Sequence, residues 1–299
     1  MTRHIAPAAA TFKGATGNTL AADVYGEEGA PVLLLHGGGQ TRHAWRKTGE
    51  LIARMGRVAY AVDQRGHGDS QWIAGGSGYN FADFAADARV LANTLAERSG
   101  VRPVAVGASL GGIACMLAEG GAQRPANGNV FSALVLVDIT PRVDLDGVGK
   151  VQAFMRSHAQ EGFGTIAEAA DAVAAYLPHR PRPRSHEGLK KNLRLHPDGR
   201  WRWHWDPKFL DGKRRVGPGA DATEQALVEA AQRITIPALL VRGASSELVQ
   251  EEHAKDFLKL VPHSSYVDVS GARHMVAGDR NDQFANAIES FLERLNTNQ

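Results

Sequence analysis

The sequence lacks the features that cross-link small secreted domains or carry a chain through a membrane. It contains a single cysteine, Cys115, which has no partner for a disulfide within the 299 residues, and this favours a reducing compartment. No stretch approaches the roughly 20 apolar residues of a membrane helix. The first residues also lack the apolar run of a signal peptide. We therefore expect a cytoplasmic protein with no membrane partner.

Net charge is also nearly absent. The 34 lysines and arginines balance 32 acidic residues to a total of +2, which argues against a general binder of polyanions. Residues 180–215 are the exception, because twelve basic residues stand there against four acids. Arginines alternate with prolines in this segment and no nucleic-acid-binding module accompanies them, so we predict no nucleic-acid partner. The segment either steers an anionic substrate or forms a solvated face.

Short runs rich in valine and leucine alternate with segments that have the apolar spacing of helices. This alternation is typical of a mostly parallel sheet with helices on both faces. A turn at residues 14–18 predicts an antiparallel hairpin where the sheet begins. The expected strands are residues 11–13, 19–25, 31–35, 58–62, 104–106, 133–137, 238–241 and 266–269, and the clearest helical segments are 84–95, 254–261 and 284–295.

The alternation stops after the strand expected at 133–137. A chain of this length accommodates one α/β core with an insertion, so we expect a core of residues 1–139 and 234–299 and a cap of residues 140–233. Asp198-Gly199 in the cap predicts the turn of a small hairpin. Three tryptophans at a spacing of two follow that turn, and they either line an apolar substrate pocket or pack the cap onto the core: Trp201, Trp203 and Trp205.

The segment Gly107-Ala108-Ser109-Leu110-Gly111 has the pattern of a nucleophile elbow. Such an elbow holds a serine on a sharp turn between a strand and a helix, where flanking glycines avoid clashes with the crowded backbone. The helix start also directs backbone N–H groups at the reacting centre. The spacing alone occurs often by chance, but here an apolar strand precedes it and helix-forming residues follow. We therefore predict that Ser109 is the nucleophile.

His36-Gly37-Gly38-Gly39 directly follows another expected strand and suits an oxyanion loop. Acyl transfer places negative charge on the former carbonyl oxygen, and two fixed N–H donors stabilise it by ~3 kcal/mol each. We expect the N–H groups of Gly38 and Leu110 to be these donors. Gly39 is the alternative donor and an expected part of the substrate site, whereas His36 has a structural role.

Serine catalysis also needs a base and an acid. His274 lies after the last expected strand and before the C-terminal helix, and imidazole can accept and return a proton near neutral pH. In the chain order serine, acid, histidine, the loop after residues 238–241 should hold the acid, and its carboxylate is Glu247. Asp138, at the end of the strand 133–137, is the rival. The sequence favours Glu247 and leaves Asp138 open.

With these motifs in place, the chain resembles the α/β-hydrolase superfamily, in particular its cap-bearing branch. That branch includes esterases, cofactor-free haloperoxidases, C–C bond hydrolases and epoxide hydrolases. The segment from Asp63 to Ser70 is similar to the branch's D-x-R-G-x-G-x-S motif, so Asp63, Arg65 and Ser70 are expected to brace loops. The resemblance implies an eight-stranded α/β-hydrolase fold with a helical cap inserted after the sixth strand. Serine at position 109, in place of aspartate, argues against epoxide or haloalkane opening.

The combined interpretation is a serine hydrolase that cleaves an ester or related acyl bond of a small molecule through an acyl-serine. No cofactor and no metal are expected, because the histidines lack metal-ligand spacing. Two other reactions use the same triad, C–C bond hydrolysis and cofactor-free peroxide chemistry (haloperoxidase or perhydrolase). A different class also remains open, a small-molecule receptor that retains a vestigial triad.

Overall fold

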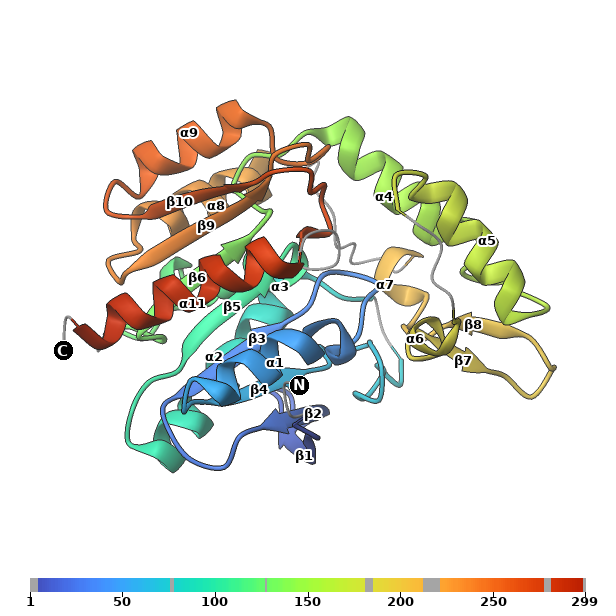
Figure 1. Cartoon of the computed structure of the whole chain (residues 1–299), viewed down its shortest axis with the longest axis horizontal. Coiled ribbons are helices and arrows are strands. Elements are labelled where there is room, and N and C mark those ends of the chain that lie inside the picture. The colour runs from blue at the N-terminus through green and yellow to red at the C-terminus, as the bar shows by residue number, and fades with distance from the viewer. Residues whose placement is uncertain are drawn as a thin grey trace.

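A computed structural model describes residues 5–75, 78–126, 128–180, 185–211, 221–276 and 281–297. Its centre is an eight-stranded sheet in the order β1-β2-β4-β3-β5-β6-β9-β10 (Figure 1). Strand β2 pairs antiparallel with β1 and with β4, and the remaining pairs are parallel. The predicted hairpin and mostly parallel sheet are therefore confirmed. The strands are β1 (Ala8–Lys13), β2 (Thr19–Tyr25), β3 (Pro31–Leu35), β4 (Val58–Val62), β5 (Val104–Ala108), β6 (Ala133–Val137), β9 (Ala238–Gly243) and β10 (Ser265–Val269).

Helices cover both faces of the sheet. Helices α1 (Arg46–Arg54) and α11 (Asn281–Thr297) cross the near face in Figure 1, whereas α2 (Phe81–Ser99) and α3 (Leu110–Gly120) pack behind it. Successive strand residues point to opposite faces. In β3, Val32 and Leu34 join the apolar cluster with α1 and α11, and their neighbours join the cluster with α2 and α3. This double burial explains why the strands are continuous apolar runs.

The insertion leaves the sheet after β6 and lies to the right of it in Figure 1. The elements of the insertion before α8 are α4 (Leu145–Ser157), α5 (Ile166–Tyr176), α6 (Glu187–Lys190), β7 (Leu193–Leu195), β8 (Trp201–Trp203) and α7 (Lys208–Asp211). Strands β7 and β8 pair antiparallel, with Leu195 opposite Trp201 and Leu193 opposite Trp203, which confirms the predicted hairpin.

Helix α8 (Asp221–Gln232) falls within the range expected for the cap, yet it packs on the core. Its neighbours are α3 and α9 (Glu251–Leu260), and a side chain at Gly120 of α3 would lie 1.9 Å from the carbonyl oxygen of Ala230. Helix α8 is therefore a part of the insertion that lies against the core. The cap boundaries expected at 140 and 233 stay a prediction.

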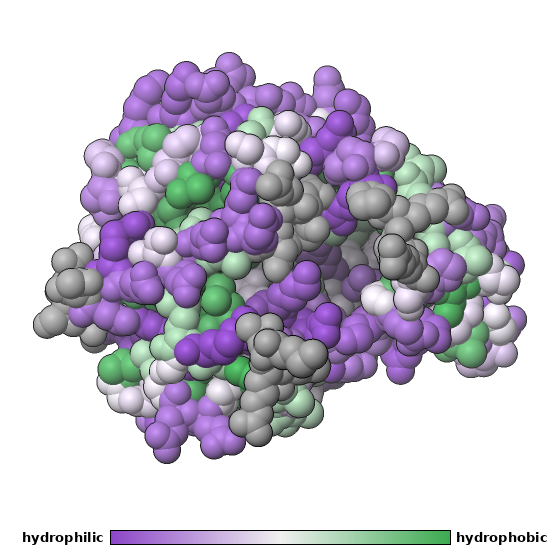
Figure 2. Space-filling model, viewed as in Figure 1, coloured by the Kyte–Doolittle hydropathy of each residue, from purple (hydrophilic) through white to green (hydrophobic). Residues whose placement is uncertain are grey.

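The visible surface is mostly hydrophilic, with apolar residues in separate patches (Figure 2). The large apolar side chains that are most exposed, Val101, Leu145 and Leu195, lie on separate parts of the chain. Within the described ranges, no helix is both long and apolar enough to cross a membrane.

Candidate active site

Ser109 occupies the turn between β5 and α3, with φ 46° and ψ −112°. A side chain at Gly107 would lie 2.5 Å from the Gly111 backbone, and one at Gly111 would lie 2.2 Å from the Leu35 carbonyl oxygen. Neither position has space for a Cβ atom, which is why the sequence places glycine on both sides of the serine. The tight turn presents Ser109 at the carboxyl edge of the sheet.

Backbone strain occurs at two positions that matter for chemistry. Among the described residues other than glycine, only Ser109 and Asp138 have positive φ, 46° and 49°. This left-handed conformation is uncommon for residues with a side chain, and strained residues cluster at active sites. Asp138 directly follows β6, the strand that pairs with β5, and the Ser109 N–H donates to the carbonyl of Val137, 3.1 Å away. The two strained residues therefore lie on neighbouring strand ends.

Asp138 is the carboxylate that holds His274. Its Oδ2 lies 2.8 Å from His274 Nδ1, and the Asp138 side chain is fully buried. The carboxylate also accepts hydrogen bonds from the Gly243 N–H at 3.0 Å and from the Ser246 hydroxyl at 2.6 Å. Three donors compensate for the loss of water around the buried charge. With its Nδ1 proton directed at Asp138, His274 keeps Nε2 as a proton acceptor.

Glu247, the first choice from the sequence, does not contact His274. Its Oε2 is buried and has no hydrogen-bond partner within the described residues. Its charge acts on Tyr176 of the cap, where burial, with a contribution from Glu247, raises the pKa of the phenol to about 12. The structure thus corrects the order of the two acids, and Asp138 takes the place next to His274.

Ser246 is a residue of this cluster that the sequence did not reveal. Its hydroxyl donates to Asp138 and accepts the N–H groups of Leu248 and Val249, each at 3.1 Å. The loop after β9 therefore contributes a hydroxyl to the acid, where a carboxylate was expected from it. The sequence did contain a signal for Asp138, its position at the end of the buried strand beside β5. The expected chain order of serine, acid and histidine favoured Glu247 instead.

The glycine loop leaves one N–H free beside Ser109. The N–H of Gly37 donates to Gln40 Oε1 and that of Gly39 to His67 Nε2, both at 3.1 Å. Between them, the Gly38 N–H has no partner among the described residues. A Cβ atom at Gly37 would lie 3.5 Å from the Cβ of Ser109, so the loop adjoins the nucleophile. Gly39, the alternative donor, is already engaged.

Leu110 is the second expected donor. It is the first residue of α3, and the N–H groups of a first helical turn have no partner inside the helix. The Ser109 hydroxyl itself makes no hydrogen bond within the described chain. Contacts between a nucleophile and its base are often longer without substrate and tighten when it binds.

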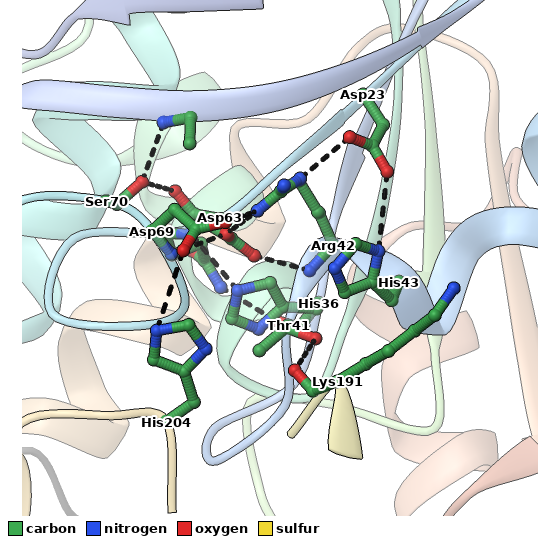
Figure 3. Close-up of polar contacts among 12 residues, drawn as sticks. Asp23, His36, Thr41, Arg42, His43, Asp63, Asp69, Ser70, Lys191 and His204 are labelled. Atoms are coloured by element: carbon green, nitrogen blue, oxygen red, sulfur yellow. Dashed lines mark hydrogen bonds and ion pairs between the residues drawn. The ribbon is translucent and has the colours of Figure 1, made fainter. Parts of the chain in front are cut away.

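A network of charges braces the loops beside the site (Figure 3). Asp63 accepts the backbone N–H of Arg42 at 2.6 Å and that of Asp69 at 2.9 Å, and the Arg42 guanidinium lies between Asp23, Asp63 and Asp69. Burial would raise the pKa of Asp69, but the hydrogen bond and charge of Arg42 lower it overall. The Ser70 hydroxyl donates to the Asp63 carbonyl at 2.5 Å.

Arg65 makes a separate pair on the other side of that segment. Its Nε and Nη2 donate to the two oxygens of Asp87 at 2.7 and 2.6 Å. Asp63, Arg65 and Ser70 thus have the bracing contacts that the resemblance implied. In the described ranges, no group of three or more histidine, cysteine, aspartate or glutamate side chains is arranged to hold a metal ion.

Two apolar cap residues lie against the glycine loop. A Cβ atom at Gly38 would be 3.2 Å from Phe209 Cζ, and one at Gly39 would be 2.8 Å from Met155 Cε. Met155 belongs to α4 and Phe209 to α7. The sequence did not single them out, because isolated apolar residues in a cap resemble any other packing residue.

The cap tryptophans mainly pack the cap. Trp203 is 7% exposed and contacts the rings of Phe154 and Phe163, with centroids 5.8 and 5.2 Å away. Trp205 is 3% exposed and adjoins Phe209 at 6.3 Å. Trp201 is partly buried. The ring contacts of Trp203 and Trp205 thus lie within the cap, and an isolated bridge between Trp205 and His67 links this segment to the core.

The fold and this cluster agree with comparisons to known proteins. The model of the alpha/beta hydrolase family matches residues 32–287. The chain belongs to this family. This confirms the α/β-fold hydrolase that the sequence predicted.

Known relatives cover most of this α/β hydrolase. It is 28% identical over 275 residues to esterase Rv0045c of Mycobacterium tuberculosis, covering 90% of the chain and 85% of the relative. It is 30% identical over 236 residues to 2-(acetamidomethylene)succinate hydrolase of Mesorhizobium japonicum, covering 78% and 77%. A crystal structure of E-2-(acetamidomethylene)succinate hydrolase superposes with a TM-score of 0.78 at 25% identity, covering 96% of this chain and 99% of that one.

Proposed function

We propose that this α/β hydrolase cleaves an ester or related acyl bond of a small molecule through an acyl intermediate on Ser109. The observation that carries the proposal is the 2.8 Å hydrogen bond between His274 Nδ1 and Asp138, at the strand end beside the strained Ser109. This arrangement supplies a nucleophile, a base and an acid that orients the base. The names of the relatives, an esterase and a hydrolase, support hydrolysis.

The mechanism follows from these positions. His274 Nε2 removes the proton of the Ser109 hydroxyl while Oγ attacks the substrate carbonyl carbon. The N–H groups of Gly38 and Leu110 stabilise the resulting oxyanion. His274 then gives its proton to the leaving alcohol, and the acyl group stays on Ser109. Water, deprotonated by His274, attacks the acyl-serine and releases the acid. Asp138 remains ionised throughout and stabilises the imidazolium.

Replacing Ser109 tests this proposal. Ser109→Ala removes the nucleophile, so kcat for a reactive ester such as 4-nitrophenyl butyrate should fall by about 10⁶-fold. A fluorophosphonate probe should label the wild-type protein at Ser109 and leave the variant unlabelled. Many turnovers per wild-type molecule would separate an enzyme from a receptor that reacts once. Retention of most of the activity by Ser109→Ala would refute the acyl-serine mechanism.

An anionic acyl substrate is the more specific candidate. Arg180, in the turn that follows α5, donates from Nη2 to the carbonyl of Met275 at 3.2 Å, one residue after His274. Its positive charge therefore lies beside the catalytic histidine. The 30%-identical relative is named for a succinate, which is a dicarboxylate. Two other cap cations lie in ion pairs, Arg202 with Asp198 and Lys190 with Glu187.

Charge-matched esters test the role of Arg180. Arg180→Gln should lower kcat/KM for a succinate half-ester by about tenfold, the size of one modest ionic contact. The neutral ester of the same length should change by less than about twofold, and the preference for the anionic ester should weaken in high salt. Equal losses on both esters would show that Arg180 acts through structure alone.

A further inference from the structure

Two fully buried imidazoles lie side by side beneath the glycine loop. His36 begins that loop, and His67 belongs to the segment between Asp63 and Ser70. Both side chains are 0% exposed, and their ring centroids are 5.1 Å apart. The catalytic steps above use neither residue. A buried imidazole without a role in proton transfer needs hydrogen bonds that explain its burial.

Each ring accepts a hydrogen bond from the backbone of the loop that carries the other ring. His36 Nε2 accepts the backbone N–H of Gln64 at 3.0 Å, and His67 Nε2 accepts the backbone N–H of Gly39 at 3.1 Å. Each histidine therefore reaches from its own loop to the backbone of the other. Because a backbone N–H can only donate, Nε2 must carry no proton in either ring.

The remaining ring nitrogens complete the same pattern. His36 Nδ1 lies 2.8 Å from the carbonyl of Gly37, and His67 Nδ1 lies 3.0 Å from the carbonyl of Arg65. Both rings are thus neutral with the proton on Nδ1, and burial lowers the pKa of His36 to about 4. The Gln64 side chain adds a third connection, from its Nε2 to the His36 carbonyl at 2.6 Å.

The bond to Gly39 determines which N–H of the glycine loop is left for the substrate. Gly39 has φ 76°, and its N–H is fixed on His67. On the other side, the Gly37 N–H is fixed on Gln40. Gly38 lies between these two fixed N–H groups. Its own N–H has no acceptor among the described residues and so remains available to an oxyanion. The His67 ring also contacts Phe209, at 4.8 Å between centroids, and this is the cap residue that lies on Gly38.

From these contacts we infer that His36 and His67 form a reciprocal clamp between two loops, and that His67 is a positioning residue that orients the Gly38 N–H toward the oxyanion. The inference rests on the proposed acyl transfer at Ser109. Neither imidazole touches the substrate. The clamp acts on the transition state, because the oxyanion exists only there and in the tetrahedral intermediate.

Paired variants of His67 test the clamp. His67→Ala removes the acceptor for the Gly39 N–H, whereas His67→Gln can replace it with Oε1. On 4-nitrophenyl butyrate, His67→Ala should lower kcat by 10- to 100-fold and change KM by less than about threefold, since loss of a whole oxyanion donor costs about 10²- to 10³-fold. His67→Gln should recover most of this loss. His263→Ala is the control for loss of an imidazole hydrogen bond elsewhere in the fold, because His263 lies 2.9 Å from the Ile236 carbonyl, and this variant should stay at the wild-type rate.

A pair of ketones reports on the oxyanion directly. An alkyl trifluoromethyl ketone adds to serine and forms an oxyanion, whereas the methyl ketone of equal length binds without adding. His67→Ala should weaken the trifluoromethyl ketone by the same factor as kcat and leave the methyl ketone unchanged. Equal weakening of both ketones, or equal losses in the Ala and Gln variants, would overturn the positioning role.

Histidine tautomers provide a test that does not depend on activity. ¹⁵N NMR of the histidine-labelled wild-type protein should show the His36 and His67 imidazoles as neutral rings protonated on Nδ1 at pH 7. Their signals are assigned by their absence in His36→Gln and His67→Gln. Protonation of either ring on Nε2 would overturn the clamp. The Ser109→Ala variant separates the two hypotheses, because activity that does not need Ser109 refutes the acyl-serine mechanism without altering the tautomers.

Discussion

Asp138 and Glu247 differ at the level of single residues in what surrounds their carboxylates. Asp138 has three donors within 3.0 Å and lies against His274. Glu247 has a buried oxygen with no partner in the described chain. A buried charge is stable only when hydrogen-bond donors replace its water. The carboxylate with three donors is therefore the one that suits the proposed role of a triad acid, which stays ionised.

Exchanging each acid for its amide separates the two candidates. Asp138→Asn would favour the wrong tautomer of His274, and in other serine triads this change lowers kcat by about 10⁴-fold. Glu247→Gln is the matched control and should alter kcat by less than about fivefold. The measurement is kcat on 4-nitrophenyl butyrate with folding checked by circular dichroism. The reverse order of losses would restore Glu247 as the acid.

At the scale of elements, the strand–turn–helix unit β5–α3 depends on close backbone approach. Gly111 lies against the Leu35 carbonyl of β3, so α3 can begin beside the sheet only without a side chain at that position. Two cap residues, Met155 of α4 and Phe209 of α7, pack against the glycine loop that follows β3. The elbow, the glycine loop and the cap are therefore packed as one unit.

A pair of glycine substitutions tests this packing. Gly111→Ala would place a Cβ atom 2.2 Å from the Leu35 carbonyl oxygen, and the forced shift should lower the free energy of unfolding by about 3 kcal/mol or more. Gly149→Ala in α4 has no atom within 4 Å of the new Cβ and should be neutral or stabilising by about 0.5–1 kcal/mol. Urea unfolding followed by circular dichroism measures both. Equal stabilities of the two variants would contradict the close approach.

At the scale of the whole molecule, hydrogen bonds join cap and core at the hairpin end of the cap. The Gly68 N–H donates to the His204 carbonyl at 2.7 Å, and the Asp206 N–H donates to the Gly66 carbonyl at 2.8 Å. The Tyr79 hydroxyl adds a bond to the Asp206 carboxylate at 2.7 Å. The loop that carries His67 therefore holds both the cap and the glycine loop.

Global stability should depend on pH through the two buried imidazoles. Burial lowers the pKa of His36 to about 4, and burial together with His36 lowers the pKa of His67 to about 3. In the unfolded chain both should titrate near 6.5, so the unfolded state binds more protons below that pH. The free energy of unfolding should therefore be highest above pH 6.5. It should fall as the pH drops toward 4, by about 3 kcal/mol for His36 alone.

Urea unfolding at pH 7, 6 and 5 measures this dependence before most carboxylates titrate. His36→Gln should give a shallower slope than the wild type, because the group that gains a proton on unfolding is gone. His204, whose pKa burial also lowers, contributes to the remaining slope. An identical slope in wild type and variant would show that His36 is not the source.

The sequence by itself determined the sheet and the strand–turn–helix elbow at Ser109. Strand runs such as 31–35 and 133–137 are apolar because both faces are covered, and this pattern is readable without a structure. The sharp turn at Ser109 was also readable, because Gly107 and Gly111 satisfy a local steric requirement. Features of this kind depend on residues a few positions apart, where spacing and residue type carry the information.

Only the tertiary structure decided which carboxylate meets His274 and which N–H of the glycine loop has no partner among the described residues. Asp138 and His274 are 136 residues apart in the chain, and Gly39 and His67 are 28 apart. No local propensity encodes such contacts. They arise because parallel pairing brings the ends of β6, β9 and β10, and likewise those of β3 and β4, to a common edge. There the direction of each side chain, rather than its order in the chain, selects the partner. The order of serine, acid and histidine therefore favoured Glu247, and geometry selected Asp138.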